Sequence, residues 1–276
     1  MNRILFLLFA CGAASATFSQ QPKYDAASIP ASLKEGAHVV KRFEDIRFEV
    51  SDIDNARLKV HQVFTVLDKQ GEASLNFREY ENRYRKLRDV DITGYNSVGV
   101  QTSRFKRKDL VKRASLDGLT NDYTEYSLYI GSTGYPATLE IEYEISFSGT
   151  LFYPSYDITE ADESVEQSTF TAKVPTELGL HFRAQKTGIK PTIKSEGGNT
   201  IYTWQVRDLK AAPKEEGSVA SSYYYPKIEL APNKFRLYDT KGDLSTWKSF
   251  GAWSYDLSKG LETLPDDRKT FYQGLV

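Results

Sequence analysis

The chain has 276 residues, which suits two β domains or one large one and exceeds the size of an ordinary small sandwich. Hydrophobic residues make up 40% of it and aromatic residues 13%, so a well-filled core is expected and disorder is excluded as the default. Lys plus Arg (36) and Asp plus Glu (37) nearly cancel to a net charge of −1, which argues against nucleic-acid binding because phosphate contacts require a basic excess.

Residues 1–20 have the pattern of a secretory signal peptide. A basic start at Arg3 precedes an apolar run over residues 4–10, and Ala14-Ser15-Ala16 fits the small-x-small cleavage rule. The run is shorter than the about 20 residues needed to cross a bilayer, and no other segment approaches that length. We therefore expect an exported protein, periplasmic or secreted, without a transmembrane segment.

Cys11 is the only cysteine, and it lies inside this leader. Residues 8–11 have the outline of a bacterial lipoprotein cleavage box, so a lipid anchor through Cys11 stays open beside ordinary cleavage. After ordinary cleavage the chain has no disulfide, thiol nucleophile or thiolate metal site. An exported chain of this size without disulfides indicates a bacterial envelope.

Residues 21–36 form a polar lead-in, and strand-like alternation fills residues 37–150, the predicted first β subdomain. Residues 58–66 alternate between two faces, and the turn signal at 68–71 predicts that residues 73–80 return as the next strand.

The clearest strand covers residues 139–147. Its apolar side chains alternate with Glu140, Glu142, Glu144 and Ser146, which predicts an antiparallel sheet with one solvated face.

Residues 151–240 form the predicted second β subdomain. Its best strands are 170–174, 180–184 and 201–206, and turns are predicted at 175–179 and 195–199, the latter a hairpin at Gly197-Gly198. Residues 222–230 are a further strand candidate, which Pro226 confines to an edge or a bulge.

Residues 241–276 have helical character. Capping residues at 243–246 precede apolar residues at helical spacing, and Pro265 opens a second helix that the chain's end interrupts. We read this stretch as a helical linker toward a downstream domain that the chain lacks. The fold prediction is all-β, with antiparallel sandwiches in two packed subdomains and a short helical C-terminal segment; one continuous saddle stays open as an alternative.

No catalytic, cofactor or metal site is predicted. His38, His61 and His181 are not followed by another ligand at metal-binding spacing, and neither a Gly-x-Ser-x-Gly elbow nor a glycine-rich phosphate loop occurs. Glu140 and Glu142 share one strand face, which predicts a solvated surface rather than the opposed carboxylates of a glycosidase. The chain itself is therefore not expected to be an enzyme.

Two groups of residues are candidate binding surfaces. The basic run 104–113 contributes Arg104, Lys106 and Arg107, and an aromatic run contributes Tyr223, Tyr224 and Tyr225. The basic run, like the acidic stretch at 157–166, also fits a solvated loop, and the tyrosines also fit core packing. A partner at these surfaces would be a protein, a peptide or a cell-wall glycan.

Several segments together resemble a known family. The resemblance covers residues 37–265 and is carried by residues 57–67, 138–143, 168–170 with Val174-Pro175, 201–204, 226–230 and, most distinctively, 247–253. The chain resembles the β-rich domain of unknown function that precedes a transglutaminase-like, papain-type domain in secreted bacterial proteins.

In that family the catalytic residues belong to the domain that follows, so the resemblance assigns no catalytic residue to this chain. It implies a non-catalytic module that binds or scaffolds for an attached transglutaminase-like enzyme. Two alternatives stay open: a stand-alone envelope protein that binds carbohydrate or peptide, and an enzyme that uses scattered carboxylates.

Overall fold

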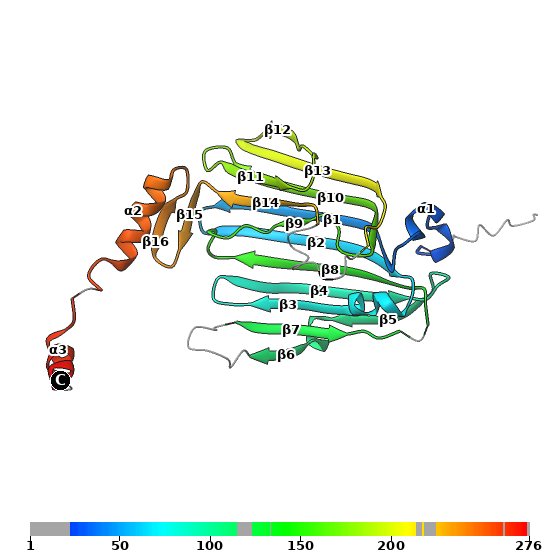
Figure 1. Cartoon of the computed structure of the whole chain (residues 1–276), viewed down its shortest axis with the longest axis horizontal. Coiled ribbons are helices and arrows are strands. Elements are labelled where there is room, and N and C mark those ends of the chain that lie inside the picture. The colour runs from blue at the N-terminus through cyan, green and yellow to red at the C-terminus, as the bar shows by residue number, and fades with distance from the viewer. Residues whose placement is uncertain are drawn as a thin grey trace, which may run out of the picture.

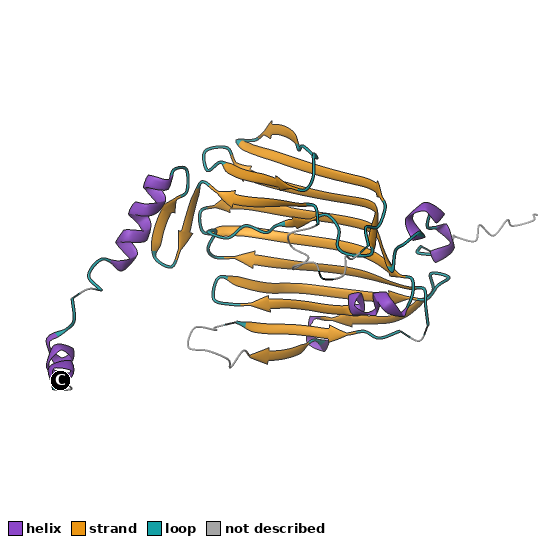
Figure 2. Cartoon of the chain, viewed as in Figure 1, coloured by secondary structure: helices purple, strands orange, loops and turns teal. Residues whose placement is uncertain are grey.

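The computed structural model describes residues 23–114, 123–132, 134–213, 217, 225–261 and 263–274. The described chain is mostly β-strand with a few short helices, as the alternation predicts (Figure 2). The predicted leader, including Cys11, lies outside the described residues, as do Tyr223 and Tyr224. None of the described helices is both long enough and apolar enough to cross a membrane.

An eight-stranded sheet forms the main layer (Figure 1). Its strands, in spatial order, are β12 (Thr192–Glu196), β13 (Asn199–Leu209), β10 (Glu163–Pro175), β1 (Val39–Asp52), β2 (Asn55–Val66), β8 (Ala137–Phe147), β4 (Arg85–Tyr95) and β5 (Gln101–Lys106). Its neighbouring strands are antiparallel except for β1 and β10, which run parallel.

The main sheet continues across residue 150, where the sequence places a boundary between two subdomains. β10 lies after that boundary and β1 before it, yet the two strands pair along most of their length, from Val39 opposite Glu163 to Glu49 opposite Lys173. Strands from both predicted regions therefore share one sheet, as in the continuous arrangement that the sequence left open.

Two small sheets form the second layer. One contains β11 (Leu180–Gln185), β14 (Lys227–Pro232) and β9 (Tyr156–Asp157), and the other contains β3 (Asn76–Glu81), β7 (Thr124–Tyr129) and β6 (Val111–Ala114). The expected return of residues 73–80 beside β2 is not what the structure has. β8 pairs with β2 from Ala56 to Val66 and occupies that edge, so the chain passes through a 3₁₀ helix and β3 pairs with β7.

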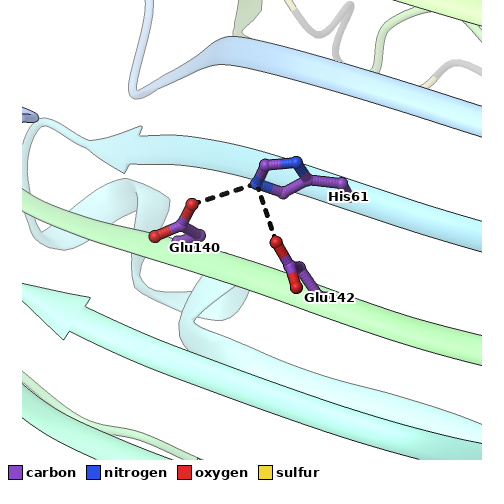
Figure 3. A group of neighbouring side chains, drawn as sticks. All are labelled: His61, Glu140 and Glu142. Carbon is purple, nitrogen blue, oxygen red and sulfur yellow. Dashed lines mark hydrogen bonds and ion pairs between the residues drawn. The ribbon is translucent and has the colours of Figure 1, made fainter.

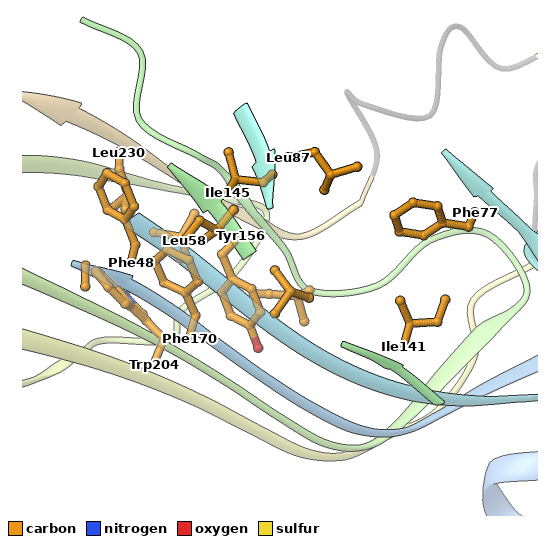
Figure 4. Close-up of a cluster of buried hydrophobic side chains, with 14 of the residues drawn as sticks. Phe48, Leu58, Phe77, Leu87, Ile141, Ile145, Tyr156, Phe170, Trp204 and Leu230 are labelled. Carbon is orange, nitrogen blue, oxygen red and sulfur yellow. The ribbon is translucent and has the colours of Figure 1, made fainter. Parts of the chain in front are cut away.

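The core lies between the two layers (Figure 4). Phe48, Phe170 and Trp204 project from the main sheet and are fully buried, and Tyr156 of β9 stacks on Phe170 at a centroid distance of 5.3 Å. Each such side chain contributes on the order of 2–3 kcal/mol of burial free energy. This core fixes the position of the small sheets over one face of the main sheet, called here the inner face.

Shorter elements complete the chain. The hairpin between β12 and β13 turns at Gly197 and Gly198, whose φ angles of 56° and 79° explain the glycine pair predicted there. Near the N-terminal end of the described chain lies α1 (Ala31–Lys34). After β14, the chain continues through β15 (Lys234–Leu237), β16 (Thr240–Asp243), α2 (Trp247–Ser258) and α3 (Asp266–Gln273). The predicted C-terminal helical segment is thus confirmed.

Candidate functional site

A pocket of about 1080 Å³ lies on the inner face of the main sheet. Its lining comes from β1, β2 and β8 of that sheet, from the whole of β3 except its last residue, and from residues 149–157 leading into β9. The alternation of β2 explains the lining, because Leu58, Val60 and Gln62 share the inner face while His61 points to the opposite one. The pocket is therefore bounded by the main sheet and by β3 and β9, which are edge strands of the two small sheets.

A buried ionic cluster forms one part of the pocket. The Lys41 ammonium lies 3.1 Å from Glu163 Oε1 and 3.5 Å from Glu44 Oε1, and it donates to the carbonyl oxygen of Ile158 at 3.2 Å. The Lys41 and Glu44 side chains are only 12% and 2% exposed. Such a charge group is tolerated in a core only because its members neutralise one another.

Further hydrogen bonds fix the Glu44 carboxylate. Gln62 Nε2 donates to Glu44 Oε1 at 2.7 Å, and Ser168 Oγ donates to Oε2. The Tyr156 hydroxyl donates to Ser168 Oγ at 2.6 Å, which extends the network from the main sheet to β9. The cluster therefore ties the two layers together beside the pocket.

The protonation states in this cluster follow from burial and charge. Burial alone would lower the pKa of Lys41, but the Glu163 and Glu44 carboxylates outweigh it and raise that pKa. Burial raises the pKa of Glu163, and the neighbouring Lys41 opposes this rise. Burial is also the main reason that the pKa of Tyr156 rises to about 12. Lys41 is thus held as a cation, with its positive charge directed at two carboxylates.

A second buried ion pair lies at the β3 side of the pocket. Arg85 Nη2 contacts Glu79 Oε2 at 2.5 Å, and both side chains are 13% exposed. The Arg85 guanidinium also lies 4.0 Å from the centroid of the Tyr80 ring, a cation–π distance. Burial, with Glu79 nearby, raises the pKa of Tyr143 well above its ordinary value.

Exposed aromatic rings form the rim. Tyr80, Phe152 and Tyr238 line the pocket and keep 48%, 76% and 54% of their surface exposed. The Tyr238 ring meets the Tyr84 ring edge-on at 5.2 Å. Large exposed rings around a concave site are unusual on a surface without a binding role, and they offer flat contact area for a ligand.

β3 presents one open edge to the pocket. Its other edge pairs with β7 from Asn76 to Glu81, and no described backbone hydrogen bond joins these six residues to a strand on the pocket side. Residues 76–80 all line the pocket. The site can therefore offer backbone donors and acceptors as well as rings and charges.

The basic residues predicted as a binding surface lie elsewhere. Arg104 and Lys106 of β5 both contact the Asp91 carboxylate, with Arg104 bidentate at 3.0 and 2.7 Å. Arg107 contacts Glu81 at 2.8 Å. Their charges are thus largely offset by carboxylates of the same chain, and none of the three lines the pocket.

Of the three tyrosines in the predicted aromatic run, only Tyr225 lies among the described residues. Tyr225 is half-buried and does not line the pocket, and the other two tyrosines lie outside the described residues. The acidic stretch 157–166, in contrast, contributes Asp157, Glu160 and Glu163 to the pocket lining.

Sequence reasoning missed the ionic cluster, although one signal was present. Glu44 stands at the alternate positions of Ile46, Phe48 and Val50, so it occupies the apolar face of its strand. A carboxylate in that position requires buried donors or cations. Lys41 stands only three residues away, but Ser168, which donates to Glu44, is brought there only by the long-range pairing of β1 with β10.

Solved structures resemble this fold at low sequence identity. A crystal structure of a candidate protease from Parabacteroides distasonis superposes with a TM-score of 0.59 at 14% identity, covering 70% of this chain and 40% of that one. An M1 zinc metallopeptidase from Deinococcus radiodurans gives 0.33 at 10% identity, covering 75% of this chain and 46% of that one. A candidate nutrient-binding protein from Legionella pneumophila gives 0.34 at 10% identity, covering 74% and 68%. The chain thus spans less than half the length of the first two.

The similarity to the Parabacteroides protein shows the fold alone. No curated protein matches the sequence. Residues 55–213, more than half of the chain, match the family DUF3857, described as a domain of unknown function with a solved structure. These residues include β2, β8 and β10 of the main sheet and all of β3. The chain belongs to the DUF3857 family.

Proposed function

We propose that this chain is a non-catalytic, exported module that binds an extended peptide along the open edge of β3. The observation that carries the proposal is the coincidence of that edge with the pocket: residues 76–79 have no partner strand on that side and line the pocket, while the Tyr80 carbonyl beyond them accepts a hydrogen bond from the Arg85 side chain. A peptide added there would complete the hydrogen bonds of β3 and place its alternate side chains against the main sheet.

The side chains of the pocket agree with recognition rather than catalysis. Lys41, Glu44 and Glu163 satisfy one another, and Arg85 does the same for Glu79, so these groups are poorly placed to exchange protons with a substrate. The described lining contains no histidine or cysteine. In a longer transglutaminase-like protein, as the sequence resemblance implies, such a module would hold a polypeptide near the attached enzyme.

The test uses fluorescence anisotropy with labelled peptides of six residues, the length of β3. For each peptide that binds, a counterpart with alternate backbone nitrogens methylated keeps the side chains but cannot pair with a strand edge. We expect methylation to abolish binding. Equal binding of the methylated peptides would exclude strand addition, and cleavage of any peptide by the purified chain would exclude a non-catalytic role.

Rim variants locate the binding. Phe152→Ala removes the most exposed ring of the pocket rim and should weaken peptide binding about tenfold, since a stacked ring contributes roughly 1–2 kcal/mol. Tyr255→Ala removes a ring that is 67% exposed on α2, away from the pocket, and serves as the matched control. Equal losses for both variants would place the peptide elsewhere.

The exposed rings favour a second candidate, a glycan, because aromatic faces stack on the apolar faces of sugars. Soluble cell-wall oligosaccharides in the same assay separate the two. Competition by the oligosaccharide that is lost in Phe152→Ala, together with failure of every peptide, would assign the pocket to carbohydrate.

A further inference from the structure

Three potential metal ligands meet on the outer face of the main sheet, opposite the pocket (Figure 3). His61 of β2 is the direct cross-strand partner of Glu142 of β8. Glu140 precedes Glu142 by two residues in β8 and therefore lies on the same face. Both strands are interior to the sheet, with β1 beyond β2 and β4 beyond β8. The backbone under the three side chains is therefore rigid.

The donor atoms have the spacing of a coordination sphere. His61 Nε2 lies 3.0 Å from Glu140 Oε1 and 3.6 Å from Glu142 Oε1, and the ligand atoms of all three residues lie within 4.8 Å of one another. Ligands about 2.0–2.2 Å from one metal ion stand roughly 3–3.5 Å apart, so only small side-chain movements are needed. From this geometry we propose that His61, Glu140 and Glu142 bind a divalent transition-metal ion of the zinc class.

Neighbouring groups orient the ligands. The Tyr95 hydroxyl donates to Glu140 Oε2 at 2.8 Å, which leaves Oε1 directed toward His61. The Phe43 ring packs edge-on against the imidazole at a centroid distance of 5.0 Å. Outer contacts of this kind fix ligand orientation in metal sites, and their loss weakens metal binding.

The site already attracts a cation. The Lys23 ammonium lies 2.9 Å from Glu140 Oε1, the oxygen that faces His61, and the Tyr24 hydroxyl donates to the same atom at 2.8 Å. Because the Lys23 side chain is 64% exposed, it can swing into solvent when a metal ion replaces it. Lys23 is therefore a competitor for the site rather than a barrier to it.

The neighbouring carboxylates Asp91 and Glu144 are weaker candidates for metal ligands than Glu142, because basic side chains already engage them. Asp91 is engaged by Arg104 and Lys106, and Glu144 lies near Arg57 at 3.2 Å. Glu142 has no lysine or arginine within ion-pair distance among the described residues. It thus remains the carboxylate whose charge is available to an added cation.

The donor set selects the kind of ion. One imidazole nitrogen and two carboxylates suit zinc, cobalt, nickel or manganese, whereas calcium and magnesium prefer oxygen alone. Glu142 is 57% exposed, so the remaining coordination positions would be filled by water. We expect zinc to bind more tightly than magnesium or calcium.

The test titrates the full chain, without a histidine tag, with zinc sulfate by calorimetry and with cobalt chloride by visible absorption. Cobalt bound to a nitrogen ligand should give d–d bands that zinc displaces. His61→Ala and Glu142→Gln should each weaken zinc binding about tenfold or more. Lys23→Gln should strengthen it, because the competing ammonium is gone.

Matched controls keep the test specific. His181→Ala removes an exposed histidine on β11, and Glu144→Gln removes the next carboxylate on the same face of β8; both should leave zinc binding unchanged. Circular dichroism confirms that each variant is folded.

Zinc binding that survives in His61→Ala, an equal response to magnesium, or no binding by the folded parent chain would each overturn the proposal. The peptide assay addresses the opposite face of the sheet and stands or falls independently of this result.

Discussion

Asp91 neutralises two of the cations that the sequence offered as a binding surface. Its pKa is lowered to about 2, first because Arg104 donates hydrogen bonds to it and then through Lys106, while partial burial opposes the shift. The folded-state pKa lies below the ordinary value of 3.8, so the ionised carboxylate stabilises the fold above that value. This contribution is lost as the pH falls from about 4 to 2.

Asp91→Asn should therefore lower the free energy of unfolding at pH 6.5 by about 0.5–1 kcal/mol, a small amount because the exposed pair is screened by solvent. Urea unfolding at pH 6.5 and 2.5 measures the change, and the gap between parent and variant should narrow at the lower pH. Asp89→Asn, an exposed carboxylate on the same strand, is the control. A gap that is equal at both pH values would contradict the assignment.

Among the elements, the β15–β16 hairpin and α2 form a small unit beyond one end of the main-sheet strands, at the left in Figure 1. Phe235 of β15 packs edge-on against Trp253 of α2 at 4.9 Å, and a Cβ on Gly242 of β16 would lie 2.1 Å from the Phe235 ring. The hairpin can hold the helix only because that position is glycine.

Gly242→Ala should push the Phe235 ring out of place and destabilise this unit by about 1–3 kcal/mol. The change should appear as a red shift of tryptophan fluorescence as Trp253 becomes more exposed. Gly251→Ala on α2 is the matched control, since its Cβ would meet nothing within 4 Å and alanine favours the helix. Identical spectra for the parent and Gly242→Ala would show that the ring does not depend on this glycine.

Individual elements were predictable where one period dominates the local sequence. The strand predicted at 139–147 is contained in β8, and the helical segment predicted over residues 241–276 contains α2, which begins at Trp247 with Thr246, one of the predicted capping residues, as its cap. The layer to which β3 belongs was not predictable. β8, which is distant in the sequence, pairs with the edge of β2, so β3 pairs with β7 instead.

The same limit applies to the candidate sites. The outer-face carboxylates were predicted to be solvated, yet the Glu140 side chain is only 12% exposed and accepts hydrogen bonds from Tyr24, Tyr95 and His61. These donors lie 45 to 116 residues away along the chain, so no local spacing could reveal them. Local patterns predict which face a residue occupies, whereas strand order decides which residues it meets.

At the scale of the whole molecule, the continuous main sheet predicts a single unfolding unit for residues on both sides of position 150. Phe170 of β10 is fully buried between Tyr156 and Trp204. Phe170→Ala should cost about 3–5 kcal/mol, because it leaves a cavity at the centre of the core.

Far-UV and near-UV circular dichroism during urea unfolding should give one common midpoint, lowered together in the variant. Phe182→Ala, at a position 41% exposed, should cost far less. Two separate midpoints, with only one of them shifted, would show that the two halves of the strand region unfold independently.

The parallel pairing of β1 with β10 also has a consequence for the order of folding. Glu44 and Ser168, which share a hydrogen bond across this pair, are 124 residues apart in the chain. Closing so long a loop has a large entropic cost, and contacts at such separation slow folding. During synthesis β1 must wait, with one edge unpaired, until the middle of the chain has emerged. The nascent protein therefore has its longest period of vulnerability to aggregation at its first strand, and it is there that a chaperone would protect it most effectively.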